Sequence, residues 1–194
     1  MLEKIIALDK NIFVFLNGLG SETFDGLWLI ITKQLYWTPF FILIFYLLFK
    51  KIGWKNLLII SVFIALLILV CDQTANLFKN YFQRLRPCYD HDIKDLIRVV
   101  KSSKTFSFFS GHAINSMATT TFVFLVFRKF YKYAYLLFFF PLIFAYSRIY
   151  LGLHFPLDII TGYVFGALFA ILFYKFFIVA QKKLTLIFEG HHFM

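Results

Sequence analysis

The sequence predicts an all-α fold, a polytopic helical bundle embedded in a membrane. Hydrophobic residues make up 61% of the 194-residue chain and aromatic residues 22%, while only 15% are charged. An ordinary soluble protein carries about 25% charged residues, and a soluble core of this size could not bury the 29 phenylalanines of this chain. No internal repeat, linker or low-complexity tract divides the sequence. We therefore expect a single integral membrane domain over residues 1–194.

Apolar runs predict about five transmembrane helices. Each run approaches the roughly 20 residues that a helix needs to cross a bilayer. The runs cover residues 27–49, 57–78, 112–127, 133–150 and 159–180. Lys33 and Gln34 lie inside the first run and weaken it as a span.

Residues 5–19 predict an interfacial amphipathic helix that lies on the membrane surface. Their apolar side chains recur at roughly helical spacing with polar positions between them, and Gly18, Gly20 and Ser21 end the pattern. If this helix inserts instead, it forms a sixth span. Charged residues interrupt the segment and no small-residue cleavage site follows it, so it does not resemble a cleaved signal peptide.

Basic residues between the runs predict the orientation of the protein. They form three clusters, which are Lys50, Lys51 and Lys55, then Arg128, Lys129 and Lys132, then Lys182 and Lys183. By the positive-inside rule all three clusters are cytoplasmic, which places residues 79–110 and 148–154 together on the outer face. The outer segment 79–110 carries seven cations against three anions. An anionic ligand is the simplest reason for that excess, and the alternative is an inverted orientation.

The formal net charge of +10 has two candidate causes, nucleic acid or an anionic membrane with phosphate chemistry. A nucleic-acid-binding protein needs a solvated basic face, whereas these Lys and Arg residues fall at the ends of apolar runs, so we expect no nucleic-acid partner. Cys71 and Cys88 form no disulfide framework, and we interpret them as free thiols.

Three cations from separate segments predict a phosphate-binding pocket at the outer face. Lys79 ends the second run, Arg86 follows it by seven positions, and Arg148 ends the fourth run. Three converging cations repel one another unless an anion lies among them, and a phosphate suits Arg forks and a Lys point charge. The alternative for a single cation at a helix end is snorkelling to the interface. That alternative is our expectation for Arg84, Arg98, Lys101 and Lys104.

Ser110 and Gly111 precede an apolar helix. Ser110 is therefore placed to cap that helix, whose free backbone N–H groups face an oxyanion, and Gly111 lets the backbone approach closely. The residues alone favour a plain helix cap for Ser110, and its phosphate-binding role rests on the family resemblance given below.

His154 and Asp158 flank Pro156, a residue favoured in the first turn of a helix. The carboxylate of Asp158 would then accept from one ring nitrogen of His154, which leaves the other nitrogen free to attack. A structural hydrogen bond is the alternative for an isolated His–Asp pair, and the neighbouring cations favour the catalytic interpretation.

These clusters form three ordered motifs: K-x6-RP from Lys79 to Pro87, SGH from Ser110 to His112, and SR-x5-H-x3-D from Ser147 to Asp158. In these motifs the chain resembles the type 2 phosphatidic acid phosphatase superfamily of membrane lipid phosphatases, over residues 72–166. The family usually has Pro before Ser-Gly-His, and this chain has Phe109 there, which puts the local loop shape in doubt.

The resemblance implies the roles of the two histidines. His154 would be the nucleophile that forms a phosphohistidine, and His112 would protonate the leaving oxygen and then act as the base for hydrolysis. A metal site built from these histidines and Asp158 is the competing interpretation, but three nearby cations would repel a divalent ion. We expect no metal and no cofactor.

The resemblance also implies the activity, which is removal of phosphate from a membrane lipid phosphate or diphosphate at the outer leaflet of a bacterial inner membrane. The family branch that includes lipid A phosphatases is similar, and undecaprenyl diphosphate, phosphatidylglycerophosphate and phosphatidic acid stay open as substrates, as does the oligomeric state. A non-catalytic protein that binds or translocates lipid phosphates is the alternative.

Polar residues outside the motifs receive weaker interpretations. Asp72 is expected to pair with a cation or to face a polar seam between helices, without a catalytic role. His91, His191 and His192 are expected at the surface.

Overall fold

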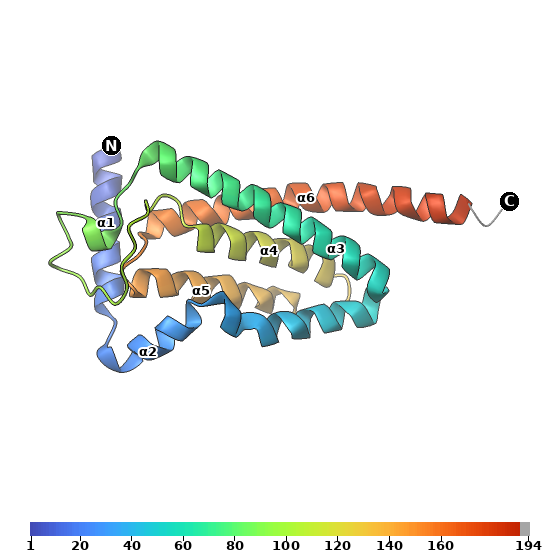
Figure 1. Cartoon of the computed structure of the whole chain (residues 1–194), viewed down its shortest axis with the longest axis horizontal. Coiled ribbons are helices and arrows are strands. Elements are labelled where there is room, and N and C mark those ends of the chain that lie inside the picture. The colour runs from blue at the N-terminus through green and yellow to red at the C-terminus, as the bar shows by residue number, and fades with distance from the viewer. Residues whose placement is uncertain (191–194) are drawn as a thin grey trace.

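The computed structural model describes residues 1–190, with side chains to residue 182, and within them it confirms the all-α fold (Figure 1). The α-helices are α1 (Leu2–Gly18), α2 (Glu22–Ile31), α3 (Thr38–Phe82), α4 (Gly111–Phe127), α5 (Phe139–Tyr150) and α6 (Pro156–Gly190). Short 3-10 helices are η1 (Gln34–Trp37), η2 (Pro87–Tyr89) and η3 (Ala134–Phe138).

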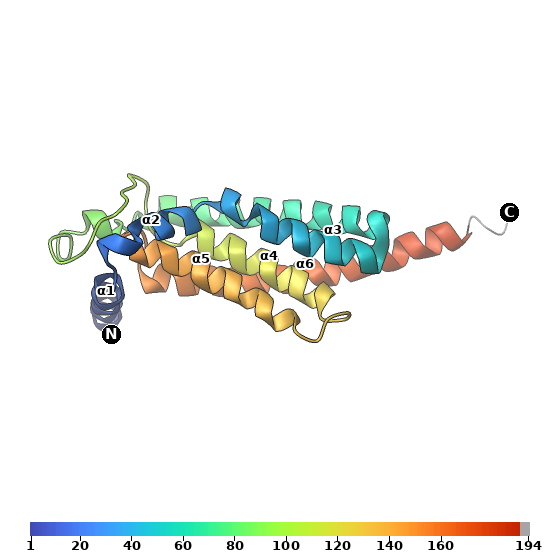
Figure 2. The same ribbon diagram turned by 90° about the horizontal axis from the view of Figure 1, so that it is seen from below.

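Helices α3 to α6 run along one common axis, and α1 crosses one end of this bundle nearly at right angles (Figures 1 and 2). Helix α3 doubles back within the 50–55 segment, so its two halves form a hairpin. The turn falls at Gly53, whose φ of 71° lies in a region that side chains other than glycine disfavour. The bend of α3 and the connection from α4 to η3 lie at the end of the bundle away from α1.

The predicted first span is wrong at its start. Residues 27–49 do not form one helix, because α2 ends at Ile31 and the chain passes through η1 before α3 begins at Thr38. The break falls at Thr32, whose buried hydroxyl accepts a hydrogen bond from Arg148 at 2.7 Å. The polar residues Lys33 and Gln34 follow it directly.

The other predicted runs coincide with helices. By length and composition, residues Gln34–Tyr89 and Pro156–Lys182 are apolar enough to cross a membrane, and Gly111–Phe127 and Ala134–Tyr150 are shorter apolar helices. The number of segments that cross the bilayer stays a prediction.

Helix α1 buries one face against the protein and exposes an apolar face on its other side. Its buried residues are Asp9, Phe13 and Asn17, which recur every four positions along one face. Apolar residues such as Leu8 and Phe15 are exposed on the other face. An apolar outer face and an orientation across the bundle end are typical of a helix that lies in the membrane interface.

Two glycines bring α6 against α4 and so position the site. A Cβ at Gly166 would lie 2.5 Å from the carbonyl oxygen of Ile114, and one at Gly162 would lie 2.9 Å from the Cβ of Ala113. Small residues four apart allow such close helix packing in membranes. The packing sets the start of α4 beside the start of α6.

Candidate active site

The predicted site residues meet at the end of the bundle that α1 crosses. They come from the last turn of α3, the connection 83–110, the start of α4, the end of α5 and the start of α6 (Figure 1). Ser110 caps α4, as the sequence predicts, because its hydroxyl accepts from the backbone N–H of Ala113 at 3.4 Å. The backbone N–H of Ser110 donates to the carbonyl of Asp158 at 3.1 Å, which joins the first turns of α4 and α6.

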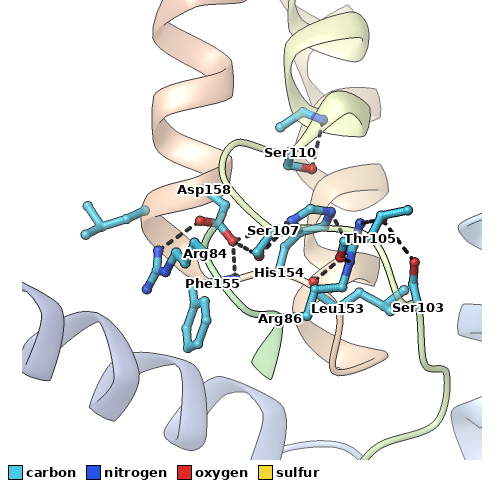
Figure 3. A network of polar contacts seen from close by, with 12 residues as sticks. Arg84, Arg86, Ser103, Thr105, Ser107, Ser110, Leu153, His154, Phe155 and Asp158 are labelled. Carbon is cyan, nitrogen blue, oxygen red and sulfur yellow. Dashed lines mark hydrogen bonds and ion pairs between the residues drawn. The ribbon is translucent and has the colours of Figure 1, made fainter. Parts of the chain in front are cut away.

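His154 is held at both ring nitrogens (Figure 3). Its Nε2 lies 2.9 Å from Nη1 of Arg86. Its Nδ1 lies 3.3 Å from the hydroxyl of Ser107 and 3.4 Å from Oδ2 of Asp158. The His–Asp pair that the spacing predicts is therefore in contact, with Ser107 beside it.

These contacts determine where the ring proton of His154 lies. A guanidinium only donates hydrogen bonds, so Nε2 accepts from Arg86 with its lone pair, and the proton is on Nδ1. Burial lowers the pKa of His154 well below its ordinary value, and the cations Arg86, Arg148 and Lys79 lower it further. The imidazole is neutral, with its Nε2 lone pair directed at a cation.

Asp158 is fully buried and accepts from three groups besides its contact with His154. Its Oδ1 accepts from Nη1 of Arg84 at 2.8 Å, and its Oδ2 accepts from the backbone N–H of Phe155 at 2.9 Å. Oδ2 also accepts a short hydrogen bond from the hydroxyl of Ser107. Ser107 can thus accept from the Nδ1–H of His154 while it donates to Asp158, which gives a relay of hydrogen bonds behind the ring.

Arg84 connects Asp158 to helix α1. Its Nη2 donates to Oδ2 of Asp9 at 2.6 Å, and its guanidinium lies 3.9 Å from the ring centroid of Phe155. The other oxygen of Asp9 accepts from the backbone N–H of Leu157 at 2.8 Å. Burial raises the pKa of Asp9, and the contacts with Arg84 and Leu157 act against that rise. Helix α1 is therefore joined to the first turn of α6 through Asp9 and its ion pair with Arg84.

Arg86 is buried and fixed by the connection that follows it. Its Nε donates to the carbonyl of Thr105 and its Nη2 to the hydroxyl of the same residue, both at 2.8 Å. Its Nη1 donates to the carbonyl of Leu153 at 2.9 Å. The guanidinium fork is thus positioned directly beside Nε2 of His154 before any ligand binds.

Arg148 and Lys79 complete a cluster of three cations with Arg86, which we call the cationic pocket. Arg148 is buried, donates to Thr32, and has an Nε without a hydrogen-bond partner among the described residues. Nζ of Lys79 lies 3.7 Å from the point where a Cβ of Gly111 would stand. All three cations lie near enough to His154 to lower the pKa of its ring.

His112 lines a groove in the bundle. Its ring stacks on Phe144 with the centroids 5.2 Å apart, and it interacts electrostatically with Arg148 and His154. Together with Lys79 and Gly111 it lines a groove of about 490 Å³. The two predicted catalytic histidines therefore come from different segments, His112 from the first turn of α4 and His154 from the connection between α5 and α6.

Comparison with known proteins assigns the chain to a family. The model of the PAP2 superfamily matches residues 56–182, which include every predicted site residue. The chain belongs to the PAP2 superfamily. The resemblance that the sequence motifs indicate is thereby confirmed.

Two curated relatives match almost the whole chain. A lipid A 4'-phosphatase of Porphyromonas gingivalis is 32% identical over 186 residues, which cover 94% of this chain and 78% of the relative. A lipid A 4'-phosphatase of Bacteroides thetaiotaomicron is 34% identical over 178 residues, which cover 90% of this chain and 79% of the relative.

Solved structures share the fold. The transmembrane PAP2-type phosphatidylglycerolphosphate phosphatase of Bacillus subtilis superimposes with a TM-score of 0.68 at 19% identity, over 89% of this chain and 86% of that one. LpxE of Aquifex aeolicus gives a TM-score of 0.63 at 21% identity, over 85% and 93% of the two chains.

Sequence reasoning missed several residues of this PAP2 site. It interpreted Arg84 and Arg98 as snorkelling cations, which is wrong, because Arg84 pairs with two buried carboxylates and Arg98 donates to both oxygens of Asp25 at 3.0 Å. Ser107 was not singled out, and its only sequence signal is its place three residues before Ser110. Asp9 gave no signal beyond a charge within an apolar helix.

The remaining sequence expectations have simple outcomes. Phe109, at the position where the resemblance led us to expect Pro, is buried and stacks on Phe165 with the centroids 5.3 Å apart, so aromatic packing fixes the loop. His91 is exposed, as expected, while His191 and His192 lie outside the described residues.

Proposed function

We propose that this PAP2-superfamily phosphatase removes the phosphate from an acylated sugar phosphate of the lipid A type, at the outer face of a bacterial inner membrane. The substrate proposal rests on the two lipid A 4'-phosphatases that match at least 90% of the chain. The structural observation that supports the chemistry is the neutral, buried His154, whose Nε2 lone pair meets the cationic pocket.

In the first step, the phosphate of the lipid would occupy the cationic pocket. The guanidinium of Arg86 would turn its Nη1 from His154 to a phosphate oxygen, which frees the Nε2 lone pair. Arg148, with its unpartnered Nε, and Lys79 would neutralise further oxygens. Ser110 and Gly111 would offer the backbone N–H groups at the start of α4.

In the second step, Nε2 of His154 would attack phosphorus and the bond from phosphorus to the lipid oxygen would break. His112 would donate its proton to that leaving oxygen. The imidazole of His154 gains positive character as the new bond forms, and the relay through Ser107 to Asp158 would stabilise it. Water, deprotonated by His112, would then attack the phosphohistidine and release inorganic phosphate together with free His154.

The proposed orientation follows from the distribution of charge along the bundle. The bend of α3 and the connection from α4 to η3, which carry two of the basic clusters, lie at the end opposite to the site (Figure 1). If the basic end is cytoplasmic, the site opens at the outer leaflet. The lipid would present its phosphate there and keep its hydrocarbon in the bilayer.

The test is phosphate release by the purified protein in detergent from a matched set of substrates. The set contains 4'-phosphorylated lipid A, undecaprenyl diphosphate, phosphatidylglycerophosphate, phosphatidic acid and a small soluble phosphomonoester. We expect the highest kcat/KM for lipid A, activity that survives chelators, and inhibition by vanadate. Equal or better turnover of the soluble ester would contradict the lipid assignment. Phosphate binding without any turnover would favour the non-catalytic alternative.

A further inference from the structure

We propose that Asp72 and Asn115 form a second recognition site, which accepts hydrogen bonds from hydroxyl or amide N–H groups of the substrate between its phosphate and its hydrocarbon. The inference rests on the proposed function, since it concerns the lipid whose phosphate lies in the cationic pocket. The pair lies on the wall of the groove that His112, Gly111 and Lys79 line at its outer end.

The positions of Asp72 and Asn115 along α3 and α4 place the pair deeper in the bundle than the cationic pocket. Asp72 precedes Lys79 by seven residues on α3, which corresponds to two helical turns and about 10 Å. Asn115 follows His112 by one turn on α4, so the two side chains share a face of that helix. A group held by Asp72 and Asn115 would therefore belong to the part of the lipid next to its phosphate.

Asp72 and Asn115 contact each other without satisfying each other's hydrogen-bonding capacity. Nδ2 of Asn115 donates to Oδ1 of Asp72 at 2.7 Å. Oδ1 of Asn115 is buried and has no hydrogen-bond partner among the described residues. Flipping the amide does not remedy this, because the amide oxygen would then face the carboxylate of Asp72. A buried acceptor left unpaired costs free energy that a ligand donor would recover.

A purely structural role explains these observations poorly. Polar pairs that only join two membrane helices lie inside the helix interface, whereas Asp72 is exposed to the groove. An ionisable residue inside a membrane-spanning helix also indicates a functional site. The rest of the groove wall is mainly apolar, with Phe41, Phe45 and Ile68 among its residues, and it suits hydrocarbon.

The polarity of the pair selects the chemical class of the ligand. Asp72 offers an exposed carboxylate on the groove wall, and beside it Asn115 holds a buried amide oxygen without a partner among the described residues; both groups accept hydrogen bonds. Hydroxyls and amide N–H groups can donate to them. Ester carbonyls, ether oxygens and hydrocarbon cannot. An acylated amino-sugar phosphate therefore fits this site, and a polyprenyl phosphate or a diacylglycerol phosphate does not.

The test compares Asn115→Leu and Asp72→Asn with the wild type, using 4'-phosphorylated lipid A and dioleoyl phosphatidic acid as substrates and vanadate as inhibitor. Thr74→Val is the matched control, since Thr74 lies on the same helix, is half-buried, does not line the groove as described, and donates to the carbonyl of Val70. We expect Asn115→Leu to lower kcat/KM for lipid A by about tenfold, the value of one hydrogen bond. Vanadate inhibition and turnover of phosphatidic acid should not change.

The outcomes separate the two proposals. An unchanged kcat/KM for lipid A in Asn115→Leu and Asp72→Asn would overturn the recognition site. An equal loss for both lipids, or a parallel loss of vanadate inhibition, would also overturn it, because the phosphate pocket itself would then be damaged. A wild-type protein that releases no phosphate from lipid A but cleaves another lipid would instead contradict the proposed substrate.

Discussion

The guanidinium of Arg84 donates to the buried carboxylate of Asp158 at 2.8 Å and, through its other terminal nitrogen, to Asp9 of helix α1 at 2.6 Å. Asp158 in turn lies behind the ring of His154. Helix α1 is therefore connected to the proposed nucleophile His154 through Asp9, Arg84 and Asp158.

Replacing Arg84 with Gln should lower kcat for lipid phosphate hydrolysis about 10- to 100-fold, because hydrogen bonds to charged groups contribute about 1.5–3 kcal/mol. KM should change little, since Arg84 contacts Asp158 and Asp9 and not the cationic pocket. Arg84→Lys should restore part of kcat. Lys10→Gln is the control, because Lys10 ties α1 to Asp90 and Asp92 without touching the site. Equal losses in Lys10→Gln would show that any loosening of α1 suffices.

Replacing His154 with Ala should abolish turnover, whereas His112→Ala should leave a protein that is phosphorylated slowly. Loss of a general acid typically costs about 10²- to 10⁴-fold. The measurement is phosphate release together with acid-labile labelling of the protein by a radioactive lipid phosphate. Near wild-type hydrolysis by His154→Ala would contradict its assignment as nucleophile.

His154 should make the folded protein less stable in mild acid. Its pKa in the folded state lies well below the ordinary 6.5 because the ring is buried and surrounded by cations. Between these two pKa values the unfolded chain binds the additional proton, so the stability is fully present above about pH 6.5 and falls by up to about 1.4 kcal/mol per pH unit below it. Thermal unfolding in detergent should therefore show a steeper loss between pH 7 and pH 5 for the wild type than for His154→Gln. Parallel curves would mean that His154 is protonated in the folded state.

Substituting Ala for Gly166 should destabilise the bundle by about 1–3 kcal/mol, the usual cost of overpacking. The new Cβ would lie 2.5 Å from the backbone carbonyl of Ile114, which cannot move without separating α4 from α6. Gly26→Ala is the control, since a Cβ at Gly26 in helix α2 would meet no atom within 4 Å. The check is the midpoint of unfolding in detergent, and equal midpoints for the two variants would refute the packing argument.

A cysteine at Leu96 should react with a membrane-impermeant thiol reagent in spheroplasts, whereas one at Lys132 should not. Leu96 is 69% exposed in the connection beside the site, and Lys132 belongs to a basic cluster at the opposite end. Cys71 and Cys88 must first be replaced by Ser, since both are free thiols. The reverse labelling pattern would place the site at the cytoplasmic face.

The sequence predicts most of the fold because the membrane restricts the choices. Helices are required wherever apolar runs cross lipid, so four of the five predicted runs coincide with helices. The first run is interrupted at Thr32, whose hydroxyl accepts from Arg148, a residue more than a hundred positions away. No local pattern contains that partner.

Within the site, the sequence by itself determined the groups that motifs place at fixed spacing, namely the cations, the cap and the His–Asp pair. His154 and Asp158 are four positions apart, and Pro156 begins α6 between them. This short spacing determines how the two side chains lie relative to each other. Only the tertiary structure decided the partners that come from distant segments. Arg84, Ser107 and Asp9 become part of the site because α1 crosses the bundle end and the packing of α4 on α6 brings the connection 83–110, which precedes α4, against Asp158. A side chain's burial and ionic partners depend on such packing, and no spacing rule encodes them.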